Sequence, residues 1–374
     1  MNDQRCYIKI SKDKLIHNFN VISTLIPKEC KVIPIIKANG YGLGSVEVAK
    51  TLSEYVETFA VAELEEAREL RQAGIKNQIL VFGYTDPSLA GELVELNLVQ
   101  SVTTLEYAKA LSKNLKALLK IHLKLDTGMH RLGFDTEEKG ILDDILSASK
   151  LPNIDICGMF SHFCESDSLS SDFTSIQLKR FLKAVEELKA RGLDVPFLHC
   201  ANSAGILAHP NAHLSAVRPG LILYGAYPSK EIKDMYLKEH PDMPFREAMT
   251  FCARIAQIRK IKRGESLSYN RTHTFEKDAV VAVVSAGYAD GIPRSLSNIG
   301  EVTINSKRYK IVGNVCMDLL MVDITEDKDK INVGDEVCFW GEESISVDEY
   351  AEKSGLINYE LYTGVSKRVV KIYE

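Results

Sequence analysis

The stretch FAVAELEEARELRQAGIKNQILVFG, residues 59–83, decides the fold because it holds one complete strand–helix–strand unit. FAVA (59–62) and ILVFG (79–83) are short apolar runs typical of buried strands. Between them, ELEEARELRQAG has apolar residues at helical spacing and closes on Gly74, a residue that favours the end of a helix. Two buried strands joined by a helix predict a parallel pair with a right-handed crossover.

The same alternation extends in both directions from this unit, up to about residue 225. A second helical stretch, TSIQLKRFLKAVEELKARG (174–192), closes on Gly192 in the same way. The other candidate strands are KVIPIIK (31–37), VQSVTT (99–104), IHLKLDT (121–127), DICGMFSHF (155–163), FLHCANS (197–203) and AVRPGLILYG (216–225). Eight strands in alternation with helices predict a (β/α)8 TIM barrel. A doubly wound open sheet would alternate similarly, but no GxGxxG motif follows the first strand.

The pattern changes after roughly residue 240, where turn residues separate one strand-like run from the next. These runs are MTFCARIAQIRKI (249–261), AVVAVVSAGYADG (279–291), EVTINSKRYKIVG (301–313), LLMVDIT (319–325) and EVCFWG (336–341). VDEYAEKSG (347–355) is the one convincing helix. We therefore predict an α/β protein with a barrel over 11–240 and a mostly antiparallel β-domain over 241–374, which a strand within 1–10 joins.

Composition excludes several classes of protein. The chain has 374 residues, 45% hydrophobic and 26% charged, with a formal net charge of -5. These values are ordinary for a globular protein and argue against a disordered chain or a nucleic-acid-binding surface. We expect no secretory signal and no membrane span, because the start lacks a basic, apolar leader and no long apolar run follows. Eight scattered cysteines without a CxxC spacing predict free thiols in a reducing cytoplasm, and no metal site.

Polar residues follow many of the predicted barrel strands. They are Lys37 with Asn39, Lys124, Asp126 through Arg131, His162, His199 with Asn202 and Ser203, and Arg218 with Gly220. Barrel enzymes build their active sites at the carboxyl ends of the strands, often with a phosphate site after the last two. Here those last loops hold Ser203, Gly220 and Leu221, the latter two expected to offer free backbone amides. The arrangement predicts a phosphorylated cofactor.

Lys37 is the most specific of these residues. It ends the run VIPII and precedes ANGYGLG, whose glycines let the backbone approach a ligand closely. A lysine at a strand end is commonly a solvated side chain with no chemical role. The functional interpretation is a lysine whose amine condenses with an aldehyde cofactor.

Nine segments in register then identify a family resemblance. They are IIKANGYGLG, LKLDTGMHRLGF, FSHF, HCANSAG, VRPGLILYG, SLSYNRTHTF, AGYADGIPR, GNVCMD and YELYTGVSKRV, which span residues 35–369. Together they resemble the alanine racemases, enzymes that use pyridoxal 5′-phosphate (PLP) to interconvert L- and D-alanine. The resemblance implies a PLP-binding barrel, a C-terminal β-domain and a head-to-tail homodimer that shares its active sites. It also implies a supply of D-alanine for cell-wall peptidoglycan.

Carried over by position, the resemblance implies two catalytic residues. Lys37 resembles the lysine that bonds PLP and acts as one acid/base, and Tyr269 resembles the base on the opposite face, supplied by the other subunit. Two groups are needed because a proton must leave one face of a planar centre and return to the other. A tyrosine, with an ordinary pKa near 10, needs help to act as a base, which the family supplies through His162 and Arg218. Arg218 resembles the arginine that faces the PLP ring nitrogen; because a guanidinium keeps its proton, we expect this arginine to suppress transamination.

Binding residues are implied in the same way. The match for the PLP phosphate is Tyr41, Ser203, Gly220, Leu221 and Tyr359, and the match for the substrate carboxylate is Arg131, Met317 and Asp318, the last two from the partner. The entrance residues are Asp167, Tyr288, Arg294 and Tyr359. Lys124 matches a lysine that is often carbamylated in the family, where it positions the arginine.

Two departures from the family pattern bear on substrate range. Asn314 stands in GNVCMD where an arginine is common, and Leu43 stands where a histidine is usual. A serine-preferring or broad-specificity racemase therefore remains an alternative, although Tyr359 favours alanine. A PLP-dependent decarboxylase on the related scaffold would need a glycine-rich phosphate loop and a cysteine–aspartate segment, which are not found. A non-enzymatic PLP carrier would have no use for Tyr269.

Overall fold

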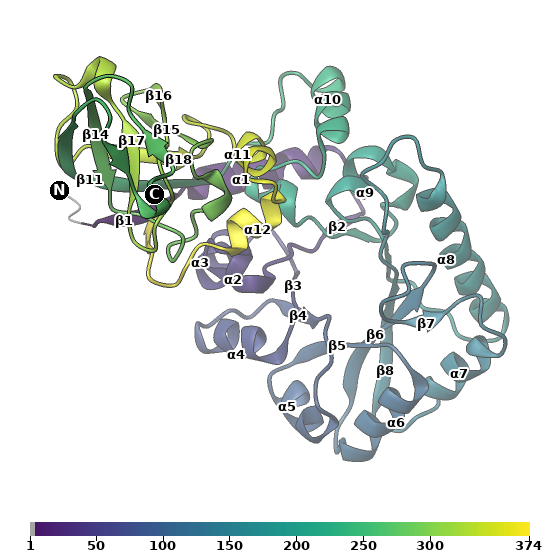
Figure 1. Ribbon diagram of the computed structural model, residues 1–374. Coiled ribbons are helices and arrows are strands. Elements are labelled where there is room, and N and C mark those ends of the chain that lie inside the picture. Colours follow the sequence, from purple (N-terminus) through teal and green to yellow (C-terminus); the bar gives the residue numbers. More distant parts are fainter. Residues whose placement is uncertain (1–3) are drawn as a thin grey trace.

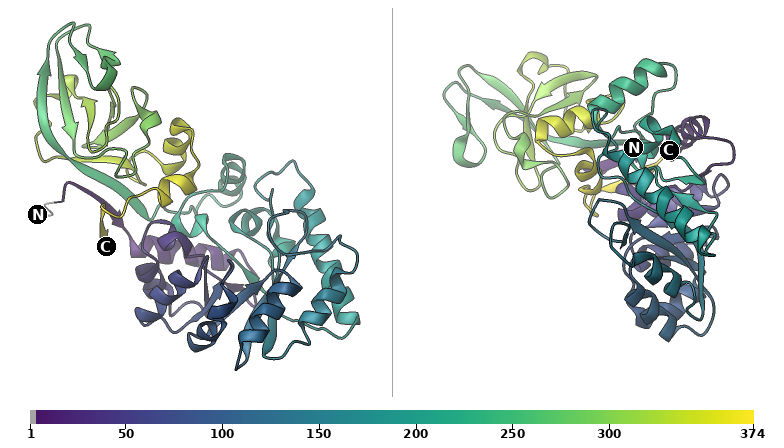
Figure 2. Two further views of the ribbon diagram at one scale, coloured as in Figure 1. Left: turned by 60° about the horizontal axis from the view of Figure 1, so that its bottom comes forward. Right: turned by 90° about the vertical axis from the view of Figure 1, so that its right-hand side faces the viewer.

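The computed structural model describes residues 4–374 and has two lobes (Figure 1). The larger lobe contains alternating strands and helices, and the smaller one contains most of the antiparallel strands. The first residues that the structure describes and the C-terminus both lie at the smaller lobe, close to one another (Figure 2). This agrees with the strand pairing, since the first and last strands of the described chain are parallel neighbours. Residues 1–3, part of the predicted N-terminal segment, lie outside the described residues.

The larger lobe is built on a parallel sheet. Its strands are β2 (Lys31–Val32), β3 (Thr58–Val61), β4 (Gln78–Val81), β5 (Leu98–Val102), β6 (Leu119–Asp126), β8 (Ile154–Phe160), β9 (Leu198–His199) and β10 (Ala216–Val217). They are hydrogen-bonded in the order β2-β10-β9-β8-β6-β5-β4-β3. A parallel bridge between Ile35 and Ala60 joins the segment after β2 to β3 and so closes the ring. The predicted barrel is confirmed.

Helices surround this sheet. They are α1 (Lys12–Thr24), α2 (Lys37–Tyr41), α3 (Ser45–Leu52), α4 (Leu64–Gln72), α5 (Ala90–Glu95), α6 (Leu105–Asn114), α7 (Ile141–Ala148), α8 (Phe173–Ala190), α9 (Ser203–Ala208) and α10 (Lys230–Glu239). Short 3₁₀ turns cover Pro87–Leu89, Pro210–Ala212 and Leu221–Tyr224, and β7 (Phe134–Asp135) pairs with β6. The predicted strand over 216–225 was wrong beyond Val217. Its apolar residues are buried, as a strand's would be, but Gly220 and Gly225 bracket a 3₁₀ turn.

The smaller lobe is a mostly antiparallel sheet organised by one long strand. That strand, β11, runs over Met249–Ile261, the range predicted from the sequence. The others are β1 (Cys6–Ile10), β12 (Ser266–Leu267), β13 (His273–Thr274), β14 (Ala279–Val284), β15 (Glu301–Ile304), β16 (Lys307–Lys310), β17 (Leu320–Asp323), β18 (Glu336–Trp340) and β19 (Val370–Tyr373). β11 pairs antiparallel with β1, β14 and β18. The N-terminal strand thus lies in this sheet rather than in the barrel.

Two helices of the C-terminal half lie where the lobes meet (Figure 1). The predicted helix is α11 (Val347–Ser354), and the sequence pattern missed the short α12 (Asn358–Thr363). α12 contacts α2 of the barrel, so Tyr359 on α12 reaches the barrel's polar edge. Three further 3₁₀ turns cover Tyr269–Arg271, Arg294–Leu296 and Thr325–Asp327.

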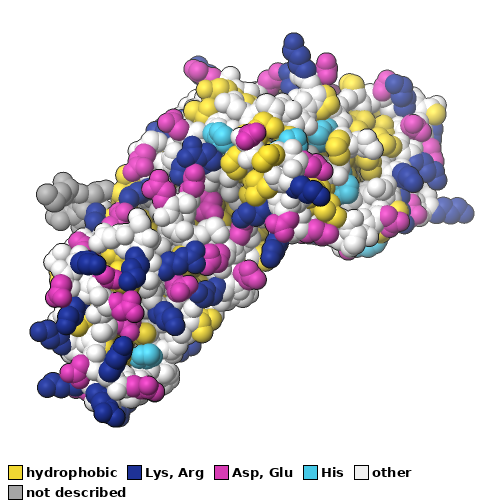
Figure 3. All heavy atoms as spheres, turned by 90° about the horizontal axis from the view of Figure 1, so that it is seen from above, with side chains coloured by type: hydrophobic (Ala, Val, Ile, Leu, Met, Phe, Trp, Pro, Cys, Tyr) yellow, Lys and Arg dark blue, Asp and Glu magenta, His cyan; other side chains and the backbone are white. Residues whose placement is uncertain are grey.

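Within residues 4–374, no helix combines the length and the apolar content that crossing a bilayer requires. On the face seen from above, Lys and Arg side chains are interspersed with Asp and Glu over the smaller lobe (Figure 3). Charges mixed in this way do not create the single-sign field that attracts a polyanion.

Candidate active site

A cavity of about 780 Å³ lies at the carboxyl ends of the barrel strands. Its walls include Lys124 near the end of β6 and the polar residues that follow β2, β8 and β10, namely Lys37, His162 and Arg218. Tyr359 of α12 adds a wall from outside the barrel. The structure therefore brings together, in one hollow, side chains up to about 320 positions apart in the sequence.

Lys37 lies at the start of an unusual turn. The four residues after it, Ala38, Asn39, Gly40 and Tyr41, have φ of 51°, 54°, 61° and 53°, the left-handed region that L residues rarely adopt. The Glu66 carboxylate holds this turn by accepting hydrogen bonds from the backbone amides of Ala38 at 2.5 Å and Ala62 at 2.7 Å. The turn fixes the direction in which Lys37 leaves the backbone.

The surroundings of Lys37 favour the neutral form of its amine. Burial lowers its pKa from the ordinary value of 10.5, and the nearby positive charge of Arg131 lowers the pKa further, while Glu66 opposes both. A lysine with a lowered pKa keeps more of its amine unprotonated and nucleophilic near neutral pH. This is the condition for condensation with an aldehyde.

Arg131 is presented by a turn that Asp126 organises at the end of β6. One carboxylate oxygen of Asp126 accepts the amides of Gly128, Met129 and His130 at 2.9–3.1 Å, and the other accepts the amide of Arg131 at 3.1 Å. These four bonds lower the pKa of Asp126 against the opposing effect of burial. The Arg131 side chain lines the cavity, where a guanidinium can bind a carboxylate with two parallel hydrogen bonds.

Arg218 is buried, 3% exposed, and its partners are carbonyls and histidines. It donates to the carbonyls of Ser161, His199 and Cys200 at 2.7–2.9 Å and to Nδ1 of His199 at 2.8 Å. Because a guanidinium can only donate, His199 Nδ1 must accept and its Nε2 must carry the proton. His199 Nε2 then donates to His122 Nδ1 at 2.9 Å. Burial lowers the pKa of Arg218 to about 10, so the guanidinium stays charged at neutral pH.

His162 and Lys124 lie beside this cation. Arg218 Nη2 lies 3.3 Å from Nδ1 of His162. Burial and then the charge of Arg218 lower the pKa of His162 well below 6.5, so this imidazole is neutral near pH 7. Burial, followed by Arg131 and Arg218, lowers the pKa of Lys124 to about 8. The cavity floor is therefore strongly electropositive.

Hydroxyl groups of Tyr41, Ser203 and Tyr359 also line the cavity. The Ser203 hydroxyl accepts the Gly220 amide at 3.0 Å, so the expectation that this amide is free was wrong. A Cβ placed on Gly220 would lie 2.6 Å from the Tyr41 hydroxyl, so only glycine leaves that hydroxyl in place. Leu221 also lines the cavity, and the Tyr41 and Tyr359 rings lie 6.0 Å apart. Burial raises the pKa of Tyr359 to about 12, which keeps this phenol protonated as a donor.

The predicted entrance residues separate into two groups. Asp167 lines the cavity near Tyr359. Tyr288 and Arg294 lie in the C-terminal half and are not among the residues that line it. Tyr288 is 43% exposed.

Of the two departures from the family pattern, Leu43 is fully buried and its carbonyl accepts the Tyr373 hydroxyl at 2.8 Å.

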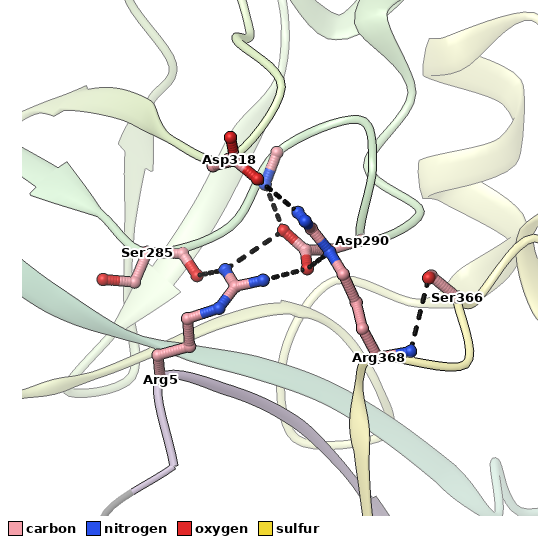
Figure 4. A network of polar contacts seen from close by, with 7 residues as sticks. Arg5, Ser285, Asp290, Asp318, Ser366 and Arg368 are labelled. Atoms are coloured by element: carbon pink, nitrogen blue, oxygen red, sulfur yellow. Dashed lines mark hydrogen bonds and ion pairs between the residues drawn. The ribbon is translucent and has the colours of Figure 1, made fainter.

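Tyr269, Met317 and Asp318 also lie away from the cavity of their own chain. Tyr269 is 70% exposed and Met317 is 52% exposed, both high values for large apolar side chains. Asp318 pairs with Arg368 at 2.7 Å, and Arg368 also contacts Asp290 at 2.8 Å (Figure 4). The structure thus does not bring the predicted second base to Lys37 within one chain.

Sequence reasoning missed several residues that support the site. Glu66 could have been noticed as an acidic residue in the first turn of the helix after β3, but its two amide partners come from different segments. His122 is in the middle of β6 and reaches His199 of β9 across the intervening strand β8. Gly158 gives His122 its space, since a Cβ there would lie 2.5 Å from the imidazole Nε2.

The residues present fit a phosphorylated aldehyde cofactor. The hydroxyl groups that line the cavity suit a phosphate, and the amine of Lys37 suits an aldehyde. Gly220 lets the Tyr41 hydroxyl approach the backbone closely, since a Cβ would lie 2.6 Å from it. The cavity is also of the size that ligand sites usually have.

Comparisons with known proteins agree with this chemistry. Residues 10–228 match the family described as alanine racemase, N-terminal domain, and residues 248–373 match alanine racemase, C-terminal domain. An alanine racemase of Carboxydothermus hydrogenoformans is 40% identical over 374 residues, covering 98% of this chain and 99% of that protein.

Solved structures show the same fold. An alanine racemase of Clostridium difficile 630 superposes with a TM-score of 0.93 at 36% identity, over 100% of this chain and 97% of that one. The alanine racemase of Bacillus anthracis, solved with bound L-Ala-P, superposes with a TM-score of 0.92 at 32% identity, over 99% and 95% of the two chains.

Proposed function

Because the chain belongs to the alanine racemase family, we propose that it interconverts L- and D-alanine with Lys37 and the partner's Tyr269 as its two acid/base groups. It is an amino-acid racemase, an isomerase that uses PLP. The family resemblance stated from the sequence is confirmed by the matches over both halves of the chain.

One observation supports the shared site above all others. The cavity of each chain contains Lys37 but not Tyr269, which is 70% exposed on the other lobe. Exposed Met317 lies on the same lobe. Large apolar side chains with this exposure favour burial against another protein surface. A head-to-tail homodimer, in which one chain's C-terminal lobe covers the other chain's cavity, would use all of these residues.

The residues then take the following roles. When bound, PLP supplies a covalent handle for the amino group and an electron sink that acidifies the α-carbon of alanine. Lys37 and the partner's Tyr269 hold and move protons at opposite faces of that carbon. Arg131 orients the substrate carboxylate, with the backbone of the partner's Met317 and the side chain of the partner's Asp318 beside it. Arg218 would donate to the ring nitrogen of the bound cofactor and keep its own proton, and His162, 3.3 Å from Arg218, would link it to the partner's Tyr269.

The remaining assignments follow from the same premise. Tyr41, Ser203, Gly220, Leu221 and Tyr359 would hold the cofactor phosphate, and Asp167 with the partner's Tyr288 and Arg294 would frame the entrance. Residues 11–240 would be the PLP-binding domain and residues 241–374 the domain that covers the partner. All eight cysteines are free and lie within the described residues, which supports a cytoplasmic location. There the enzyme would supply D-alanine for peptidoglycan.

Mixed dimers test the shared site directly. A heterodimer of Lys37→Ala and Tyr269→Phe protomers, isolated through two different affinity tags, contains one site with both native residues and one with neither. We expect each homodimer to be inactive and the heterodimer to recover up to about half of the wild-type rate, because one site of two is intact. A heterodimer as inactive as its parents would show that Lys37 and Tyr269 do not meet across an interface.

A further inference from the structure

The loop that carries Tyr269 has a backbone that its own residues do not favour. Ser268 and Arg271 have φ of 64° and 49°, and neither is glycine; Asn270 between them has φ of 60°, a value that asparagine tolerates. Left-handed backbone at non-glycine residues persists only where surrounding structure imposes it. Contacts outside the loop must therefore hold these residues in place.

Asn314 supplies the central contact. Its Nδ2 donates to the Tyr269 carbonyl at 2.7 Å, and its own carbonyl accepts the Ser268 hydroxyl at 2.8 Å. The two segments approach so closely that a Cβ on Gly313 would lie 2.8 Å from the Ser268 Cβ. Asn314 is thus bonded to the loop through both its side chain and its backbone.

A second asparagine connects the same two segments at their other ends. Asn298 Oδ1 accepts the Gly313 amide at 2.7 Å, and Asn298 Nδ2 donates to the Thr272 hydroxyl at 3.1 Å. The neighbouring Ser297 hydroxyl accepts the Val315 amide at 3.0 Å. The Tyr269 loop and the segment 313–316 are therefore joined at both ends into one unit.

This unit also leads directly into Met317. The exposed side chains of Tyr269 and Met317 therefore share one support. We propose that Asn314 is a positioning residue for Tyr269: by holding the carbonyl of Tyr269, it sets the position that the phenol takes in the partner's active site. This inference rests on the proposed function, in which Tyr269 serves the partner's cavity.

The chemistry of the contact makes Asn314 specific in this role. The bond needs a short side chain that ends in a neutral N–H donor. Aspartate has the same length but only acceptor oxygens when ionised, so Asn314→Asp would place a carboxylate against the Tyr269 carbonyl. Asn314→Ala would remove the hydrogen bond to the Tyr269 carbonyl and keep the one that the Ser268 hydroxyl donates to the carbonyl of residue 314. Both variants should release the loop without touching Lys37 or the cavity.

Single variants of the PLP-loaded enzyme give the first test of the proposal. We expect Asn314→Ala to lower kcat roughly 10- to 100-fold, the range that a displaced catalytic group causes, with bound PLP and dimer mass unchanged. The matched control is Asn114→Ala, which removes an exposed bond of the same kind, from Asn114 Nδ2 to the Ala110 carbonyl at 2.9 Å, far from Tyr269. That control should keep the wild-type rate.

Heterodimers of Asn314→Ala with two different second protomers then distinguish a positioning role of Asn314 from general damage to the protein. A heterodimer of Asn314→Ala with Lys37→Ala has one site with native Lys37 and a native Tyr269 loop, so its rate should rise well above that of the Asn314→Ala homodimer. A heterodimer of Asn314→Ala with Tyr269→Phe has no such site and should fall below it. If neither combination differs from the Asn314→Ala homodimer while Lys37→Ala with Tyr269→Phe recovers activity, the positioning role is overturned and the proposed function stands.

Isotope effects give a second readout. With alanine deuterated at the α-carbon, Asn314→Ala should raise the kinetic isotope effect in one direction of racemisation only, since Tyr269 removes the proton from one enantiomer and Lys37 from the other. An equal change in both directions, or none, would overturn the proposal because it would point to damage that does not act through Tyr269.

Discussion

Arg218 Nη2 and His162 Nδ1 lie 3.3 Å apart at the floor of the barrel cavity, so a buried guanidinium and a neutral imidazole share one side of the site. Arg218 makes its remaining bonds to three carbonyls and to His199. None of these partners is a carboxylate, so the guanidinium keeps its full positive charge toward the cavity. This is the feature from which a first prediction follows.

Arg218→Lys should lower the stability of the protein as well as the rate of the reaction. A lysine has three donors on one nitrogen and cannot reach all of these acceptors, so buried carbonyls would lose their partners at about 1–3 kcal/mol each. We expect the free energy of unfolding in urea to fall by about 2 kcal/mol or more. Arg254→Lys is the control, because Arg254 makes one exposed bond, to the Gly334 carbonyl at 3.3 Å. Equal stability of the two variants would contradict this account of Arg218.

Lys37→Ala should prevent covalent attachment of the cofactor. The proposed function assigns cofactor attachment to Lys37, whose lowered pKa favours the nucleophilic neutral amine, and alanine leaves no amine in its place. Borohydride reduction followed by peptide mass analysis should find PLP on the Lys37 peptide of the wild type and on no peptide of the variant. PLP still attached to the variant, for instance at Lys124, would contradict the assignment.

Lys124 should take up carbon dioxide in a pH-dependent way. Only a neutral amine forms a carbamate, and with a pKa of about 8 a large fraction of Lys124 is neutral at pH 8.5. Below about pH 7 the amine is protonated and the reaction should stop. With ¹³C-labelled bicarbonate, a carbamate resonance should appear at the higher pH and vanish in Lys124→Ala. It should persist in Lys120→Ala, which removes an exposed lysine from the same strand; a signal lost with Lys120 instead would place the modification elsewhere.

Asp290 should matter more for stability than an exposed acid does. Its side chain is fully buried and pairs with Arg5 at 2.6 Å and Arg368 at 2.8 Å (Figure 4). Asp290→Ala leaves both arginines without this partner and should lower the free energy of unfolding by about 3 kcal/mol. Glu57→Ala breaks an exposed pair with Lys31 and should cost less than about 1 kcal/mol. Similar urea midpoints for the two variants would show that the buried network does not support the lobe.

Much of the fold follows from local sequence patterns. The apolar runs and glycine stops predicted the barrel strands, and β11 was predicted over the residues it occupies. The pattern of apolar residues fails as a predictor of strands where buried residues do not have an extended backbone. Leu221–Tyr224 are apolar and buried, yet they form a 3₁₀ turn. The short α12 was missed because its six residues hold less than two helical turns, too few for a period.

The candidate site was only partly predictable. Strand ends indicated Lys37 and Arg218, because their place follows from the barrel itself. The bond between His122 of β6 and His199 of β9 crosses the intervening strand β8, and no spacing along the chain encodes it. Asn314 was noticed as a departure from a family pattern, but its bond to the Tyr269 carbonyl is visible only in three dimensions.

The most direct test of the central claim is chiral chromatography of L-alanine incubated with the purified, PLP-loaded protein, with L-serine in parallel. We predict that D-alanine appears and that the two enantiomers approach equal amounts, the equilibrium of a racemase. Conversion of L-serine at a much lower rate would agree with the wall that Tyr359 contributes to the cavity. If the PLP-loaded protein formed no D-alanine, alanine racemisation by this chain would be contradicted.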